Sequence, residues 1–300
     1  MTAFYLDCDT GVDDAFALAV LAGVDLAGIG TVSGNTSAGQ AARNTLDLLA
    51  LAGHDKIPVA VGAHHPLAGD FGGGASRVHG GNGIGGVTLP TAPRTPLDTT
   101  AAELLVKLSN EHELRIVATG PLTNLALALR LDPTLPDRIR DVTVMGGAVR
   151  VPGNITPHAE ANIANDPEAA AAVLAAGWDV TLVPLDVTLQ HRFDETDRAA
   201  LAQRGTPLTS ALAEMISGYF DYYETVFGVR ASPLHDPLAA CVATGEVRVG
   251  EAPRLGLRVA LDGEERGRLI EDPAVEARTR VVLTLAEPGA PIIRRLILGG

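Results

Sequence analysis

Short apolar runs alternate with amphipathic segments along the first two-thirds of the chain. The apolar runs are predicted to be buried strands, at residues 3–8, 26–32, 58–62, 114–118, 141–145 and 180–184. The segments between them have helical periodicity or helix-terminal residues, at residues 13–23, 37–53, 99–111, 121–131 and 167–176. Strands that alternate with helices in this way predict an α/β fold, in which a mostly parallel, Rossmann-like central sheet is flanked by helices.

The last third of the chain has a different pattern. Residues 210–228 and 237–245 are predicted to be helices, whereas residues 255–261 and 278–285 alternate apolar and polar positions as half-buried strands do. We therefore expect a small C-terminal β-region. Residues 64–98 are rich in glycine and lack a helical period, which predicts a long loop. A loop of this length inside a compact chain usually has a function. Because neither a linker nor a repeat interrupts the pattern, residues 1–300 are predicted to form one domain.

Composition narrows the function classes. Hydrophobic residues make up 46% of the 300 residues and charged residues 20%, which favours a large core over disorder. With 36 acidic and 23 basic residues the net charge is −13, which disfavours nucleic acid or an anionic membrane surface as a partner. No apolar run is long enough to span a bilayer, and no signal-peptide pattern precedes the first strand. The two cysteines, Cys8 and Cys241, favour buried packing over a thiolate metal site, and a cytoplasmic location is expected.

Four aspartates cluster where the first strand ends and the first helix begins. They are Asp7, Asp9, Asp13 and Asp14. Ligands of open α/β sheets bind at the carboxyl ends of strands, and converging carboxylates repel one another unless a cation neutralises them. Hard divalent ions such as Ca²⁺ or Mg²⁺ prefer oxygen ligands, so they are the natural partners. A helix cap with acidic first-turn residues and no metal is the weaker interpretation for so many acids.

Two enzyme classes use such a cluster. Asp7 and Asp9 resemble the Asp-x-Asp pair of haloacid-dehalogenase phosphatases, but Gly11 stands where that class has threonine or valine. The whole of residues 7–15 is similar to the opening signature of inosine-uridine preferring nucleoside hydrolases, Asp-x-Asp-x-Gly-x-Asp-Asp-Ala. Thr10 stands where many members of that family have proline.

Further segments resemble the same family in the expected order, from residue 5 to residue 240. They are residues 33–35, 79–83, 118–126, 145–147, 153–154, 160–162 and 234–239. Two positions depart from the usual pattern, since Asn82 replaces an aspartate and Ala161 replaces a phenylalanine.

The resemblance implies a Ca²⁺-dependent hydrolase that splits the N-glycosidic bond of ribonucleosides into base and ribose. It implies that Asp9 activates a water molecule held by the metal and that His235, a residue type that titrates near neutrality, protonates the leaving base. The implied metal ligands are Asp9, Asp14, the main-chain carbonyl of Thr119 and Asp236. The implied substrate-binding residues are Asp13, Asn35, His79, Asn154, Glu160, Asn162 and Asp236. A homodimer or homotetramer is expected.

Two other functions stay open. One is a Mg²⁺-dependent phosphatase that uses the Asp7 and Asp9 pair, and the other is a non-catalytic protein that binds nucleosides or ribose. The sequence does not decide between purine and pyrimidine bases. The aromatic residues within 219–227 suit a base pocket, the core or a subunit contact equally, and Arg230 suits the pocket mouth or solvent equally.

Overall fold

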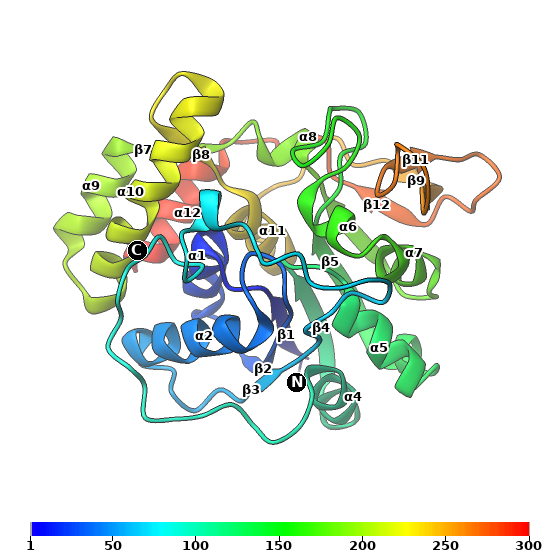
Figure 1. The fold of residues 1–300 in the computed structure, drawn as a ribbon, viewed down its shortest axis with the longest axis horizontal. Coiled ribbons are helices and arrows are strands. Elements are labelled where there is room, and N and C mark those ends of the chain that lie inside the picture. The colour runs from blue at the N-terminus through cyan, green and yellow to red at the C-terminus, as the bar shows by residue number, and fades with distance from the viewer. Residues whose placement is uncertain (1, 300) are drawn as a thin grey trace.

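The computed structural model describes residues 2–299 and builds a central sheet with helices on both faces (Figure 1). Its eight strands lie in the order β3-β2-β1-β4-β5-β6-β12-β9, and every neighbouring pair is parallel except β12 with β9. The strands are β1 (Thr2–Cys8), β2 (Leu26–Thr31), β3 (Val59–Val61), β4 (Glu113–Ala118), β5 (Ile139–Met145), β6 (Val180–Val183), β9 (Arg254–Leu255) and β12 (Thr279–Val281). The predicted α/β fold with a mostly parallel sheet is confirmed.

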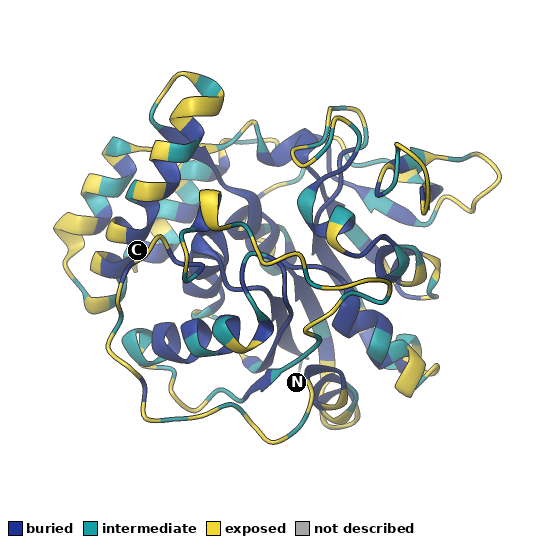
Figure 2. Ribbon diagram, viewed as in Figure 1, coloured by how far each residue is buried: buried dark blue, intermediate teal, exposed yellow. Residues whose placement is uncertain are grey.

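The sheet separates two hydrophobic cores. Successive side chains of β1 point to opposite faces, so Leu6 and Cys8 lie in one core and Ala3 and Tyr5 in the other. The first core contains residues of α1 (Val12–Leu21), α2 (Ala38–Ala52), α10 (Pro207–Phe227), α11 (His235–Thr244) and α12 (Gly289–Leu298). The second contains residues of α4 (Ala101–Glu111), α5 (Thr123–Leu131) and α7 (Pro167–Ala175). Figure 2 shows the strands buried between these layers, with exposed residues on the outer surfaces of the helices.

The C-terminal β-region is present but is partly merged with the central sheet. Strand β10 (Leu257–Val259) lies within the strand predicted at residues 255–261, and it pairs antiparallel with β11 (Leu269–Glu271), which was not predicted. In contrast, β12 pairs in parallel with β6, where Val281 lies opposite Leu182, and β9 closes that edge. The strands are also shorter than the alternating patterns from which they were predicted.

Several short elements were not predicted. They are α3 (Ser76–His79), η1 (Leu135–Arg138), α6 (Ala161–Asn165), α8 (Leu185–Thr188), β7 (Arg192–Asp194), α9 (Glu195–Arg204), β8 (Ala231–Pro233) and also α12. Most of them are too short to show a hydrophobic period, and α9 is polar around most of its circumference. The predicted loop at residues 64–98 holds a single turn of helix, α3, and reaches the sheet at an isolated bridge between Leu97 and Ala60.

The chain order creates a crevice beside β1. From β1 the chain proceeds to β2 and β3 on one side and then returns to β4 on the other side. Ligands of open α/β sheets bind where the strand order reverses in this way. Asp9 follows β1 and Thr119 follows β4, so both residues lie at this switch point. Among residues 2–299, no helix has the length and apolar character needed to cross a membrane.

Candidate active site

A cavity of about 500 Å³ opens at the carboxyl ends of the central strands. Its polar lining residues are Asp13, Asn35, His79, Thr119, Asn154, Glu160, Asn162, His235 and Asp236. Its apolar and aromatic lining includes Val78, Ile155, Leu185, Leu189, Tyr219, Tyr222, Tyr223, Val226 and Phe227. A pocket that is largely apolar with a few convergent polar groups is typical of a small-molecule site. Every residue predicted to bind substrate lines this cavity, whereas Asp9 and Asp14 lie behind its wall.

Asp9 and Asp14 are held together by one asparagine. The backbone N–H of Asn35 donates to Asp9 Oδ2 at 2.6 Å, and its side-chain nitrogen lies 3.2 Å from both Asp9 Oδ1 and Asp14 Oδ2. Asp14 also accepts from the N–H of Gly11 at 2.7 Å and from the hydroxyl of Thr119 at 2.7 Å. A side chain at position 11 would collide with Asn35, which is why the turn requires glycine there.

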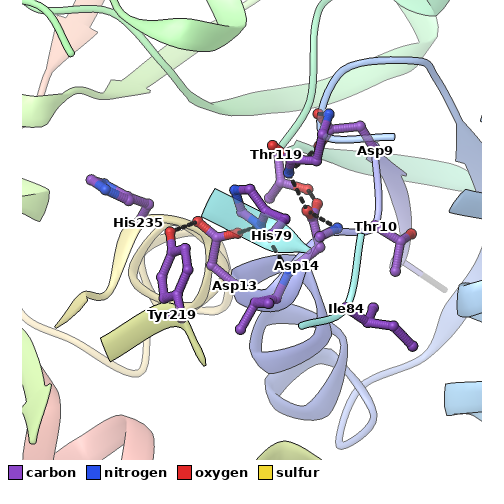
Figure 3. Close-up of polar contacts among 12 residues, drawn as sticks. Asp9, Thr10, Asp13, Asp14, His79, Ile84, Thr119, Tyr219 and His235 are labelled. Carbon is purple, nitrogen blue, oxygen red and sulfur yellow. Dashed lines mark hydrogen bonds and ion pairs between the residues drawn. The ribbon is translucent and has the colours of Figure 1, made fainter. Parts of the chain in front are cut away.

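Three carboxylates converge closely enough to hold a metal ion. One oxygen from each of Asp13, Asp14 and Asp236 lies within 4.8 Å of the others. Asp13 Oδ2 accepts from the hydroxyl of Tyr219 at 2.9 Å (Figure 3). Its buried Oδ1 makes no hydrogen bond within residues 2–299 and lies 3.8 Å from His79 Nδ1. Burial and the neighbouring charges raise the pKa of Asp14 to about 6, and they raise the pKa values of Asp9 and Asp236 well above the usual range. This cluster of acceptor oxygens fits a divalent cation, because a cation would offset the repulsion between them.

Asn162 and Glu160 hold the Thr119 carbonyl and the loop after β5 in place. Asn162 donates from Nδ2 to the carbonyl oxygens of Thr119 at 2.8 Å and Met145 at 3.1 Å. Glu160 caps α6 and accepts backbone N–H groups, including those of Asn162 and Gly147, each at 2.8 Å. Burial raises the pKa of Glu160 despite these hydrogen bonds. The Thr119 carbonyl is therefore held in place at the cavity wall.

His235 is the first residue of α11, and both of its ring nitrogens have partners. Nδ1 lies 2.8 Å from the hydroxyl of Thr188, and Nε2 lies 3.0 Å from the hydroxyl of Tyr223. Burial lowers the pKa of His235 to about 4, so the ring is neutral at pH 7 in the free protein. The expectation that His235 titrates near neutrality is therefore not met in the free protein, because burial lowers its pKa.

His79 is the last residue of α3 and lines the cavity. Its Nδ1 lies 3.1 Å from the backbone nitrogen of Val12 and accepts that N–H, so Nε2 carries the proton of the neutral ring. Burial lowers the pKa of His79, and its ring centroid lies 5.1 Å from that of Tyr219. His79 is therefore a neutral hydrogen-bond donor in the cavity.

The undecided residues near α10 separate into two groups. Tyr219, Tyr222, Tyr223 and Phe227 line the cavity, whereas Phe220 is fully buried in the core. Arg230 does not line the cavity, because its guanidinium pairs with Glu195 at 2.6 Å and with Asp221. The aromatic cluster thus serves both the cavity and the core.

Asp7 lies outside the cavity although it belongs to the same sequence motif. Asn124 donates from Nδ2 to Asp7 Oδ2 at 3.0 Å, and burial raises the pKa of Asp7 to about 8. A phosphatase nucleophile has to reach its substrate, so this placement argues against the phosphatase alternative. Both Cys8 and Cys241 are buried free thiols, as expected.

The contribution of α8 to the cavity was not predicted from the sequence. Leu185 and Leu189 line the cavity, and Thr188 holds the ring of His235. The exposed apolar residues Ile155 and Val226 at the cavity were not identified either. No motif marked these positions, and a single helical turn has no periodic signal.

Comparison with known proteins gives consistent similarities. Residues 4–290 match the family model described as inosine-uridine preferring nucleoside hydrolase. The chain is 37% identical to uridine nucleosidase 1 of Arabidopsis thaliana over 239 residues, which cover 78% of this chain and 71% of that protein. It is 39% identical to the pyrimidine-specific ribonucleoside hydrolase RihA of Citrobacter koseri over 237 residues, covering 77% and 75%. The solved purine-preferring ribonucleoside hydrolase from Gardnerella vaginalis superposes with a TM-score of 0.92 at 32% identity, covering 100% of this chain and 98% of that one.

Proposed function

The chain belongs to the inosine-uridine preferring nucleoside hydrolase family and is a nucleoside N-ribohydrolase, and we propose that it acts with Ca²⁺ in the cavity described above. The observation that carries this proposal is the convergence of Asp13, Asp14 and Asp236 at a cavity lined by hydroxyl-binding side chains. We also propose that residues 1–300 act as one catalytic domain. A cytoplasmic location and a homodimer or homotetramer stay predictions.

The proposed metal ligands are Asp9, Asp14, Asp236 and the Thr119 carbonyl. The unpartnered Oδ1 of Asp13 supports a cation in this place, because a buried carboxylate oxygen without a donor is costly unless a positive charge faces it. Carboxylate and carbonyl oxygens are the ligands that Ca²⁺ prefers, and its flexible coordination suits a set of mixed donors. A bound cation of this kind supplies positive charge that lowers the pKa of a coordinated water molecule.

Asp9 is the proposed base. Its carboxylate is 1% exposed and is oriented by two hydrogen bonds from Asn35, so it has few alternative positions. A carboxylate whose pKa is raised by burial and by Asp14 binds a proton more readily than a surface carboxylate does. Asp9 therefore takes the proton from the water that attacks C1′ of the ribose.

The ribose is proposed to lie against the polar wall of the cavity. The residues that bind its hydroxyl groups are Asp13, Asn35, Asn154, Glu160, Asn162 and Asp236. Hydrolysis develops positive charge on the sugar ring, as in other glycosidases. Buried carboxylates nearby stabilise that charge, and fixed hydrogen bonds orient the ring for attack.

The base is proposed to lie among the aromatic residues of α10, with His79 as a donor to it. Because His235 is neutral in the free protein, with its ring oriented by Tyr223, it takes up a proton from solvent during the reaction and passes it to the departing base, while the proton that Asp9 takes from water returns to solvent. Negative charge developing on the base favours the protonated imidazole and so draws a proton toward the ring. The relatives' names include both pyrimidine-specific and purine-preferring hydrolases, and the cavity lining favours neither base class.

A panel of ribonucleosides tests the proposal. Purified protein with Ca²⁺ is incubated with uridine, cytidine, inosine, adenosine and guanosine, and released ribose is measured as reducing sugar. Release of ribose supports the proposed reaction. Phosphate release from nucleotides without ribose release indicates the phosphatase alternative, and tight nucleoside binding without either product indicates a binding protein.

A further inference from the structure

Asn44 is a buried amide on α2 that lies behind the cavity rather than in it. Asn44 is only 2% exposed. Its single amide nitrogen, Nδ2, donates to two main-chain carbonyls, Thr10 O at 3.2 Å and Asn82 O at 2.9 Å. Its oxygen accepts from Gln40 Nε2 at 2.9 Å, which fixes the orientation of the amide. Asn44 therefore connects two segments that are far apart in the sequence.

These two segments also meet at the cavity. The first is the turn at residues 9–14, which carries the carboxylates, and the second is the glycine-rich loop at residues 79–87. They touch where His79 Nδ1 accepts the N–H of Val12. The approach is close, since a Cβ at Gly11 would lie 2.6 Å from His79 Nδ1. The position of the His79 ring therefore depends on the spacing of the two segments.

The glycine-rich loop is internally braced, so a displacement at one point is transmitted to the others. Asn82 donates from Nδ2 to Val87 O at 2.9 Å and accepts the N–H groups of Ile84 at 3.2 Å and Gly86 at 2.9 Å. The N–H of Gly85 then donates to the carbonyl of His79 at 2.7 Å. The hydrogen bond from Asn44 thus reaches His79 through two short steps.

The turn has a second connection to α2, and the loop connection does not depend on it. The hydroxyls of Thr10 and Thr45 lie 2.7 Å apart. Since the Thr45 hydroxyl donates to the Ala41 carbonyl at 2.8 Å, it accepts the proton of Thr10. Loss of the Asn44 amide would therefore leave the turn attached to α2 while it removes the hydrogen bond between α2 and the loop at Asn82.

We propose that Asn44 is a positioning residue that holds His79 in register with the carboxylate-bearing turn, an inference that rests on the proposed role of His79 in substrate binding. Asn44 does not line the cavity, so it acts through its two hydrogen bonds. The bond to Asn82 holds the loop of His79, whereas the turn at Thr10 keeps a further contact with α2 through Thr45. A small displacement of a positioned group, on the order of 1 Å, lowers turnover by roughly 10²-fold in enzymes.

The test is a double-mutant cycle between Asn44 and His79. Asn44→Asp keeps the side-chain shape but has no N–H to donate, so kcat/KM for the best nucleoside should fall by about 10-fold to 100-fold. Gln40→Ala is the matched control on the same helix. It removes the partner of Asn44 Oδ1 while both donated bonds stay, and we expect a change smaller than about twofold. In a His79→Ala background, Asn44→Asp should lower kcat/KM by no more than about threefold further.

Each outcome bears on the proposal. An equal loss from Asn44→Asp with and without His79 overturns it, as does an unchanged Asn44→Asp variant. Full activity of His79→Ala overturns both the inference and the proposed role of His79. The proposed hydrolase activity is judged separately, by whether the wild-type protein releases ribose. If Asn44→Asp does not fold, Asn82→Ala in the half-exposed loop replaces it. That change removes the internal bracing, and its effect should likewise shrink in the His79→Ala background.

Discussion

Removal of the metal should make the stability of the protein depend on pH in an unusual direction. Asp7, Asp9 and Asp236 are buried carboxyl groups whose folded pKa values are raised, that of Asp7 to about 8 and those of the other two well above the usual range. In the unfolded chain the same groups ionise near pH 4. Between pH 7 and pH 8 the folded metal-free protein therefore holds protons that the unfolded chain has lost.

The sign of the effect follows from proton binding. When the folded state binds more protons, stability is greatest below the unfolded pKa and falls as the pH rises toward the folded pKa. Each carboxyl group that stays protonated contributes a slope of about 1.4 kcal/mol per pH unit. Asp7 alone, with a folded pKa of about 8, should lower the free energy of unfolding by about 1 kcal/mol between pH 7 and pH 8, and Asp9 and Asp236 act in the same direction. Histidines add little, because unfolded histidines are mostly neutral in this range.

Calcium should reverse the part of this loss that comes from Asp9 and Asp236, because these two residues are proposed metal ligands and Asp7 is not. A cation that binds the folded protein at 100 times its Kd adds about 2.7 kcal/mol of stability, and it favours the ionised form of its ligands. Urea unfolding followed by circular dichroism, with EDTA or with Ca²⁺, measures both slopes. Asp236→Asn should flatten the metal-free slope because it removes one of the titrating groups. Asp132→Asn is the control, since hydrogen bonds from Thr134 and Arg138 lower the pKa of this exposed carboxyl to about 2 and it is ionised in both states. A metal-free stability that is constant or rises from pH 7 to pH 8 would refute the reasoning.

The remaining predictions concern individual side chains. Asp9→Asn should lower kcat by at least the roughly 10²–10⁴-fold of general acid–base steps, and near-normal kcat in a variant that still binds Ca²⁺ would remove Asp9 from the mechanism. His235→Ala should slow natural nucleosides by about 10²–10⁴-fold but barely slow p-nitrophenyl riboside, whose leaving group needs no proton; equal losses on both substrates would mean that His235 is not part of the acid. Cys241 is buried with its pKa raised to about 12, and burial also raises the pKa of Cys8 well above its usual range, so neither thiol should react with a thiol reagent at pH 8 until the protein is unfolded. Rapid modification of the native protein would contradict the packing described here.

The sequence was most informative where a residue's role follows from its position at a strand end. The strand pattern placed Asp9 and Thr119 directly after predicted strands, and the structure makes those strands neighbours and puts both residues at the switch point of the sheet. Sequence spacing was less informative about side-chain direction. Asp7 is two residues from Asp9, yet Asp7 pairs with Asn124 away from the cavity, whereas Asp9 pairs with Asn35 of the cavity wall.

Long-range contacts could not be predicted in the same way. The sequence shows a histidine at position 235, but its low pKa comes from burial between Thr188 and Tyr223, which the fold brings together from separate helices. The pairing of β12 with β6 likewise joins segments about a hundred residues apart, and no local pattern specifies it. The role of Asn44 depends on two carbonyl groups that carry no side-chain signal at all.

The most direct test of the proposed metal site is a calcium titration of the metal-stripped enzyme. Ribose release from the best nucleoside substrate is measured while Ca²⁺ occupancy is followed in the same samples by calorimetry or a calcium-sensitive dye. We predict that the stripped enzyme releases no ribose and that turnover rises in proportion to occupancy up to one ion per chain. Full turnover by the stripped enzyme, or activity that does not follow occupancy, would contradict the proposed role of the carboxylate cluster.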